Sequence, residues 1–459
     1  MAIAIANATL LGGRGEPARP AAILVSGERI AGIASGDDMP GLLARAAIVH
    51  DAQGALALPG FVNAHHHSYG DVLRGAENDL PLELWSFFTV AWGRVLDAAT
   101  MRIAILLGAA EMLRAGFTAV LDHAPHFALR NAAVEAHRES GLRVAFAPML
   151  HDLHDHALMG FTLPDGLRAR IEGAGFPELD AYATAVRALA RDLRGDPRVR
   201  LVLGPNAPQR CSPALLELWG KLRDELAVPV HAHLLETRAQ AVLCDALFAD
   251  GVVGELARRG LLAPGTSFAH CVWARPRELD LIARHGVAIV HNPASNLMLG
   301  SGIMPYGSCA TRGIVLGLGS DSANTGGRAD HFEAMRLATM LPRVDARGRC
   351  APTALDALEM AAAGGAAAMG LAGETGRLAP GYLADIVLLR LGDATTATAL
   401  PSPEAVIRHA STRNVEATMV GGEWAWRDGR ILAFDDTLEH EARNDGDQLR
   451  VVLIFDARN

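Results

Sequence analysis

The sequence predicts an α/β protein: a parallel (β/α)8 barrel with a small β-sandwich domain built from both chain ends. Through the middle of the chain, short apolar runs alternate with helical stretches, and polar residues of catalytic type follow most of these runs. Both chain ends instead hold short β-like segments broken by glycines and charged turns. A length of 459 residues exceeds what one small core needs and favours a large domain with a smaller one.

Eight apolar runs are predicted to be the barrel strands, and the amphipathic or Ala/Leu-rich stretches between them are predicted helices. Strands are expected at residues 56–62, 119–122, 144–148, 200–203, 228–233, 267–270, 287–291 and 314–319. Helices are expected at residues 100–115, 179–193, 213–225 and 276–285. This alternation is typical of a TIM-type barrel, in which the carboxyl ends of the strands share one rim.

The remaining segments predict the small domain. β-like segments are expected at residues 3–10, 22–25, 30–33, 385–389, 417–420 and 424–427. Neither group is long enough for a domain of its own, so together they are expected to form one β-sandwich that the barrel interrupts. The expected division is 1–57 with 382–435 for this domain, 58–381 for the barrel and 436–459 for a C-terminal tail.

Composition argues against several classes of partner. The net charge of −9 comes without a basic patch, which argues against nucleic acid. No apolar run approaches 18 residues, and the first residues lack the pattern of a signal peptide, so no membrane span and no export are expected. The five cysteines are scattered and form no CxxC pair, which is typical of reduced thiols in the cytoplasm.

The stretch Pro-Gly-Phe-Val-Asn-Ala-His-His-His at residues 59–67 is the most informative motif. His65 and His67 follow an apolar run at i and i+2, and side chains two apart on a strand point the same way. Two imidazoles roughly 7 Å apart along a strand can converge on one ion at about 2.0–2.1 Å per bond. His66 is expected to point away and to be structural.

Further polar residues end the other predicted strands. His233 stands three residues before Glu236, His270 ends the sixth strand, and Asp321 follows the eighth. Three histidines and one carboxylate predict a site for one divalent ion, Zn²⁺ first, with Fe²⁺ or another late first-row ion as alternatives. Such an ion lowers the pKa of bound water from 15.7 to about 7. Hydrolytic deamination also needs a carboxylate that shuttles protons, and Glu236 is the candidate.

Any one of these histidines alone is more often a satisfied polar residue than a ligand. The pair His65 and His67 occurs together with His233, Glu236 and the polar residues at the other strand ends, in this order. A chance occurrence of the whole set is improbable. His231 shares a strand face with His233 and competes for the ligand role. The spacing to Glu236 favours His233, with His231 deeper in the barrel.

With these motifs the chain resembles the amidohydrolase superfamily, and within it the branch of triazine hydrolases and of cytosine-, guanine- and adenosine-type deaminases. The likeness runs across nearly the whole chain. It is carried by residues 58–67, 73–75 with 82–85, 110–118, 204–208, 233–237, 269–270, 290–296, 317–321 and 381–385.

The resemblance implies roles for individual residues. The metal ligands would be His65, His67, His233 and Asp321. Glu236 would be the proton shuttle, His270 would stabilise the developing tetrahedral centre, and Asp321 would also accept the water proton. Substrate contacts are expected from Trp85, His123, Gln209 and Asn292. The carboxylated lysine of two-metal relatives is not expected, because Lys221, the only lysine in the chain, lies in a helical pattern.

These observations predict a cytoplasmic, mononuclear metal-dependent hydrolase that deaminates an amino-substituted purine, pterin, pyrimidine or triazine and releases ammonia. One alternative keeps the fold and site but hydrolyses an amide, carbamate or urea, or displaces chloride, an alkylamine or a thiolate. Another is a non-catalytic binder, which the full set of ligands with Glu236 argues against. The expected partners are a small-molecule substrate and, by family analogy, further copies of the chain; neither nucleic acid nor a membrane is expected.

Overall fold

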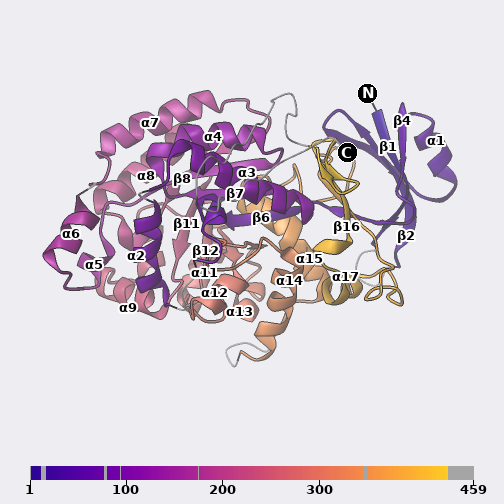
Figure 1. The fold of residues 1–459 in the computed structure, drawn as a ribbon. Helices are drawn as coiled ribbons and strands as arrows, with labels where there is room; N and C mark the ends of the chain where they lie inside the picture. Colours follow the sequence, from indigo (N-terminus) through magenta and orange to yellow (C-terminus); the bar gives the residue numbers. More distant parts are fainter. Residues whose placement is uncertain are drawn as a thin grey trace, which may run out of the picture.

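The computed structural model describes residues 2–11, 17–76, 80–93, 95–173, 175–345 and 350–432. A ring of parallel strands wrapped by helices makes up most of this chain, and a β domain lies beside it (Figure 1). The predicted tail at residues 436–459 lies outside the described residues. Among the residues described, no helix combines the length and apolar character that crossing a membrane requires.

The barrel strands are parallel and follow one another around the ring in chain order. Leu203 bridges to Val230, and His66 bridges to Asp321; these two pairs join the two halves of the barrel and close it. The fourth position is shared by two short strands, β9 and β10, which both pair with β8. The strands are β6 (Phe61–His66), β7 (Phe117–Ala124), β8 (Arg143–Leu150), β9 (Val199–Leu201), β10 (Gly204–Pro205), β11 (Val230–Leu234), β12 (Thr266–His270), β13 (Ala288–His291) and β14 (Leu316–Leu318).

The first expected strand, at 56–62, is in fact two strands. Its first part, β5 (Leu56–Pro59), pairs with strands of the small domain, and β6 begins after Gly60. A Cβ atom at Gly60 would lie 2.2 Å from the side chain of Thr118, so only glycine lets the chain pass between the two sheets here. The barrel strand therefore begins at Phe61, and residues 56–59 pair in the sheet of the small domain instead.

Helices cover the outside of the ring, and α8 shows how the sequence limits them. Ser212 caps its start by accepting a hydrogen bond from the Leu215 amide, a proline fills the first turn, and Ala227 ends it in the left-handed region. The buried side chains include Trp219 and Leu222, which face the strands. The helices are α1 (Met39–Leu43), α2 (Leu82–Gly93), α3 (Ala98–Arg114), α4 (Arg130–Glu139), α5 (Asp155–Leu158), α6 (Asp165–Glu172), α7 (Leu179–Asp192), α8 (Pro213–Leu226), α9 (Arg238–Leu247), α10 (Val252–Arg258), α11 (Pro276–Arg284), α12 (Pro293–Met298), α13 (Tyr306–Ala310), α14 (His331–Met340), α15 (Ala354–Glu359), α16 (Gly365–Ala368) and α17 (Pro403–His409).

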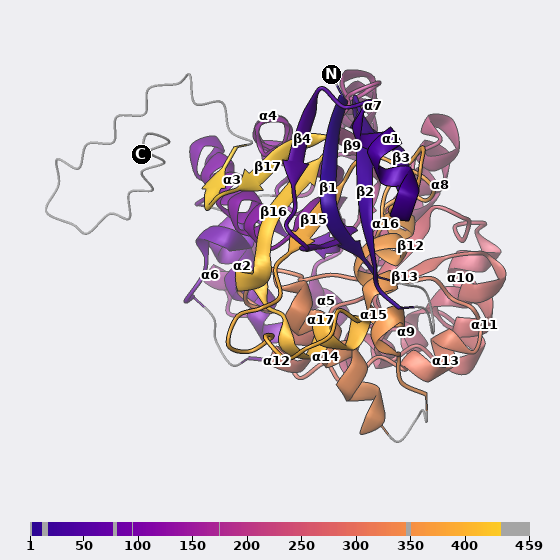
Figure 2. The same ribbon diagram turned by 90° about the vertical axis from the view of Figure 1, so that its right-hand side faces the viewer.

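In the part of the chain that the structure describes, the small domain is one nine-stranded sheet. As predicted, it contains strands from both chain ends. Figure 2 shows the N-terminal strands in indigo beside the C-terminal strands in yellow. Side chains from both ends, such as Ile5, Ile23, Ile386 and Met419, share one buried core. The strands besides β5 are β1 (Ala2–Leu10), β2 (Arg19–Ser26), β3 (Arg29–Ala34), β4 (Ile48–Asp51), β15 (Ile386–Leu389), β16 (Val415–Val420), β17 (Glu423–Arg427) and β18 (Arg430–Ile431). The proposed division into domains stays a prediction.

Candidate active site

The carboxyl ends of the barrel strands bring most of the predicted site residues together. The imidazole of His65 lies at the centre of the group, with ring centroids 4.8 Å from His67, 4.9 Å from His233 and 5.4 Å from His270. All four side chains are buried or nearly so. Asp321, in the loop after β14, reaches the same cluster: its Oδ1 is 3.7 Å from His65 Nε2 and 3.4 Å from His67 Nε2.

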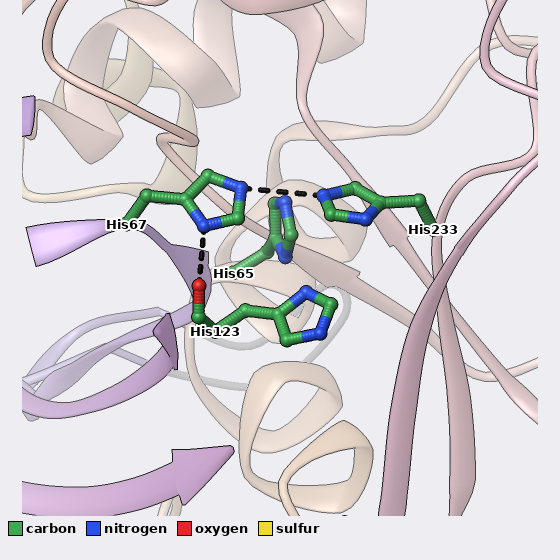
Figure 3. Close-up of side chains that lie close together, drawn as sticks. All are labelled: His65, His67, His123 and His233. Atoms are coloured by element: carbon green, nitrogen blue, oxygen red, sulfur yellow. Dashed lines mark hydrogen bonds between the residues drawn. The ribbon is translucent and has the colours of Figure 1, made fainter. Parts of the chain in front are cut away.

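The hydrogen bonds of His67 and His233 fix which nitrogen of each ring is free. The Nδ1 atom of His67 lies 2.5 Å from the His123 carbonyl oxygen, and that of His233 lies 2.7 Å from the Asn206 carbonyl oxygen. Because a carbonyl oxygen only accepts, each Nδ1 must donate, and each Nε2 then carries a lone pair. These two Nε2 atoms face each other at 3.2 Å, as Figure 3 shows.

Two facing lone pairs repel unless a cation lies between them, so this arrangement fits a metal ion. His65 Nε2 is also buried and has no hydrogen-bond partner among the described residues. Burial lowers the pKa of His65 and His233 well below the usual range, aided by the neighbouring rings, which keeps both imidazoles in the neutral form that binds metals. Imidazole and carboxylate donors suit Zn²⁺, Fe²⁺ and related ions.

His123 also lies within reach of this group, but its ring has a different position. One possible ligand set joins it to His65, His67 and His233, and another joins His65, His270 and Asp321. In Figure 3 the rings of His67 and His233 point at each other above His65, whereas the His123 ring lies below. The ring of His123 is buried, and its backbone carbonyl accepts a hydrogen bond from His67.

Asp321 and His270 are held in strained backbone conformations. Asp321 has a φ of 63° and His270 a φ of 75°, in a left-handed region that costs a non-glycine residue energy and that recurs at active sites. The Asp321 carboxylate accepts hydrogen bonds from Ser295 Oγ at 2.6 Å and from the Ser322 amide at 2.8 Å. The remaining lone pairs of its two oxygens are available to the cluster of imidazoles.

Glu236 completes the group beside His270. Its Oε2 lies 3.8 Å from His270 Nε2, which is also 3.8 Å from Asp321 Oδ2. His270 Nδ1 lies 2.9 Å from Asn296 Oδ1, an acceptor, so the ring donates there and turns Nε2 toward the two carboxylates. Burial raises the pKa of the Glu236 carboxyl to about 7; His270 opposes this rise, and Asp321 adds to it.

The predicted substrate contacts Trp85, His123, Gln209 and Asn292 are all buried. Trp85 is buried on α2, and Gln209 is buried with its Oε1 3.9 Å from Cys244 Sγ. Asn292 packs against His270, with its Nδ2 3.3 Å and 3.4 Å from the two ring nitrogens. Their contact with a substrate stays a prediction.

His66 points away from the cluster, as expected. Its Nδ1 donates to the Asp321 carbonyl oxygen at 2.9 Å, and its Nε2 lies 2.9 Å from Asp71 Oδ2. His66 thus ties the end of β6 to the loop that carries Asp321.

Ser295 and Asn296 orient the acidic and imidazole groups, yet no role could be assigned to them from the sequence. Both lie in residues 290–296, one of the stretches that carry the family resemblance, so the sequence did mark this segment. Their function depends on α12, which turns their side chains back toward Asp321 and His270. Such a turn is not readable from residue spacing.

A metal-dependent hydrolase on a (β/α)8 barrel is the class that this fold and site define, and known proteins agree. Residues 56–425 match the amidohydrolase family. The chain is 36% identical to a 5-methylthioadenosine/S-adenosylhomocysteine deaminase of Nitratidesulfovibrio vulgaris, over 84% of this chain and 83% of the relative. It is 32% identical to a 5'-deoxyadenosine deaminase of Methanothermobacter thermautotrophicus, over 91% and 92%.

Solved structures give the same result. An adenosine deaminase from Xanthomonas campestris with bound zinc superposes with a TM-score of 0.82 and 26% identity, covering 95% of this chain and 94% of the other. Residues 406–459 also match the aspartyl/asparaginyl beta-hydroxylase family, but the second half of that stretch, 433–459, lies outside the described residues.

The chain belongs to the amidohydrolase family. The predicted fold, family and enzyme class, a metal-binding hydrolase that acts on carbon–nitrogen bonds of a small molecule, are confirmed. The relatives are deaminases, in agreement with the predicted hydrolytic deamination.

Proposed function

We propose that this protein hydrolytically deaminates an adenosine-type nucleoside, replacing the amino group on the purine ring with oxygen and releasing ammonia. The observation that carries the proposal is the alignment of Glu236, His270 and Asp321, each 3.8 Å from the next, beside the three candidate histidine ligands. This set offers one acid and one base on a single face of a buried centre.

The substrate class rests on the relatives. Those compared above act, by their names, on 5-methylthioadenosine, S-adenosylhomocysteine and 5'-deoxyadenosine. All three carry adenine on a ribose that is modified at its 5' position. We therefore place 5'-substituted adenosines ahead of the pterins, pyrimidines and triazines that the sequence left open.

In the proposed site His65, His67, His233 and Asp321 hold one divalent metal. When bound, the metal supplies the activation of a water molecule at neutral pH. The hydrogen bonds from His67 and His233 to backbone carbonyls keep the Nε2 lone pairs directed inward.

The protein's own groups then move the protons. Glu236, with a pKa near 7, donates a proton to the ring nitrogen beside the amino-bearing carbon. The Asp321 carboxylate accepts a proton from the attacking water. His270, whose Nδ1–H is held by Asn296, accepts through Nε2 a hydrogen bond from the hydroxyl group at the developing tetrahedral centre. The remaining hydroxyl proton passes to the amine, which leaves as ammonia, and the proton held by Asp321 restores Glu236.

A substrate screen tests the proposal. The purified, zinc-loaded protein is incubated with adenosine, 5'-deoxyadenosine, 5'-methylthioadenosine, guanine, cytosine and a triazine, and ammonia release is measured. We expect ammonia from the adenosines and a much lower kcat/KM for the other rings. Ammonia from another ring class alone would overturn the substrate assignment, and none from any compound would overturn deamination.

Zinc as the native metal, a cytoplasmic location and a homo-oligomeric state belong to the same proposal. The zinc in the adenosine deaminase structure and the imidazole-rich donor set support the first. Metal analysis of protein purified without chelators tests the identity of the metal, and the mass of the protein in solution tests the homo-oligomeric state.

A further inference from the structure

His231 forms a buried connection beneath the candidate metal ligands. It lies on β11 two residues before His233, so both side chains point into the barrel, with His231 deeper. Its Nε2 is 2.8 Å from His65 Nδ1, and its Nδ1 is 2.8 Å from Ser267 Oγ on β12. All three side chains have 0% exposure, so no water competes for these contacts.

The strand register fixes this arrangement. His231 and Ser267 are direct partners in the parallel pairing of β11 with β12. His65 reaches the same level from β6 across the barrel, with its ring centroid 5.0 Å from that of His231. The connection therefore spans three strands of the barrel.

His65 differs here from the other two candidate histidine ligands. His67 and His233 each donate Nδ1–H to a backbone carbonyl, which can only accept, so the backbone alone sets their tautomers. His65 instead meets a ring nitrogen, which can donate or accept. Its tautomer therefore depends on that of His231.

Only one direction of this connection is compatible with a metal. If His231 Nε2 donated to His65, the proton of His65 would sit on Nε2, the atom that faces Asp321 and the other ligands. In the opposite direction His65 Nδ1 donates to His231 Nε2, and His231 Nδ1 donates to Ser267 Oγ. His65 Nε2 then presents its lone pair to the site.

We propose that His231 is a positioning residue that, with Ser267, sets the tautomer and ring orientation of His65 and so strengthens metal binding. The inference rests on the proposed metal-dependent function. It also explains why His231 is not itself a ligand: both of its ring nitrogens are occupied. Partners of this kind typically change metal affinity or activity 10- to 100-fold when removed.

The test measures zinc affinity by competition with a chromogenic chelator, without any substrate. His231→Phe keeps a ring of similar size but no acceptor, and we expect its zinc dissociation constant to rise about 10- to 100-fold. His231→Gln places an amide oxygen near the position of Nε2, and we expect it to restore most of the affinity. His331→Phe, which removes a buried histidine that bonds the Val62 carbonyl, is the matched control and should bind zinc like the wild type.

The Co²⁺-substituted proteins give a second readout, because the visible spectrum of Co²⁺ reports the ligand geometry. We expect a changed spectrum for His231→Phe and a nearly native one for His231→Gln. Wild-type zinc affinity in His231→Phe, or equal losses in the Phe and Gln variants, would overturn the proposal. Should His231→Phe not fold, Ser267→Ala replaces it, and unchanged affinity there would overturn the proposal. Failure of the deaminase proposal is seen separately, as zinc-loaded wild-type protein that releases no ammonia.

Discussion

The carboxyl group of Glu236 is the single group on which the proposed proton transfers depend most. Glu236→Gln keeps the shape and the burial of the side chain but cannot transfer a proton. We expect kcat to fall about 10²- to 10⁴-fold, the usual contribution of a general acid or base, with the zinc content unchanged. Glu135→Gln, on the exposed face of α4, is the control and should be fully active. Full activity of Glu236→Gln would remove it from the mechanism.

Asn296 gives a second prediction, because its Oδ1 holds the Nδ1–H of His270. In Asn296→Ala the His270 ring loses this acceptor and can take the other tautomer or rotate. We expect kcat to fall about 10-fold or more, a part of the 10²- to 10⁴-fold that proton transfer supplies, while KM changes little. Asn414→Ala, which removes buried hydrogen bonds in the small domain, controls for general destabilisation. An equal effect of both substitutions on kcat would contradict the positioning of His270.

At the level of single residues, the sequence was enough to predict the site residues that lie directly at strand ends. His65, His67, His233, His270 and Asp321 all converge, because parallel strands place their carboxyl ends on one rim. The partners of these residues could not be predicted in the same way. The carbonyl groups of His123 and Asn206, for example, act through the backbone, where residue type carries no signal.

At the level of secondary structure, the order of the strands was predictable, but several of their boundaries were not, and the division between β5 and β6 shows why. Residues 56–62 are apolar with only Pro59 and Gly60 as an interruption, so periodicity alone joins β5 to the start of β6. What separates them is the contact of Gly60 with Thr118, a residue of the neighbouring strand. Such a contact exists only after the sheets have packed.

The connection between barrel and small domain contains a buried ion pair. Arg143, at the start of β8, donates to Asp385, just before β15, over 3.2 Å and 3.3 Å, and both side chains are almost fully buried. Arg143→Met would leave a buried carboxylate without its cation, a change that typically costs about 3–5 kcal/mol. Urea unfolding with zinc present measures this loss of unfolding free energy.

The matched control is Arg187→Met, which breaks an exposed pair with Glu225. The two side chains are 38% and 44% exposed, and such pairs contribute about 0–1 kcal/mol. If Arg143→Met lost no more stability than this control, Arg143 would not be important for joining the two domains.

At the level of the whole molecule, a buried neutral histidine predicts a loss of stability in acid. His331 is fully buried against Phe117 and donates Nε2–H to the Val62 carbonyl; burial lowers its pKa to about 4. In the unfolded chain its pKa is near 6.5, so the unfolded state binds more protons between these values. Its contribution is therefore complete above pH 6.5 and is lost as the pH falls toward 4, by about 3 kcal/mol.

His331→Gln isolates this contribution, because glutamine keeps a donor but does not titrate. We expect the unfolding free energy of the wild type to fall more steeply than that of the variant between pH 7 and pH 4.5. Other histidines remain in both proteins and cancel in the comparison. Parallel pH profiles of the two proteins would show that His331 does not contribute.

Metal removal tests how far the candidate site holds the barrel together. The donors come from the end of β6, from β11 across the ring, and from the loop after β14, which lies next to β6. An ion that binds them therefore connects the two sides of the barrel and parts of the chain that are distant in sequence. An ion that binds only the folded state stabilises it by about 4.1 kcal/mol when its free concentration is 1,000 times the dissociation constant. We therefore expect chelation to lower the urea midpoint, and each tenfold rise in free zinc to add about 1.4 kcal/mol. In Asp321→Asn, which weakens the donor set, the same zinc series should give a markedly smaller gain in unfolding free energy.

Hydrogen exchange shows which parts of the chain the metal stabilises. Amides of β6 and β11 should lose protection on chelation, whereas those of β1 and β2 in the small sheet should not. A wild-type stability that does not respond to zinc would contradict a metal site at these residues.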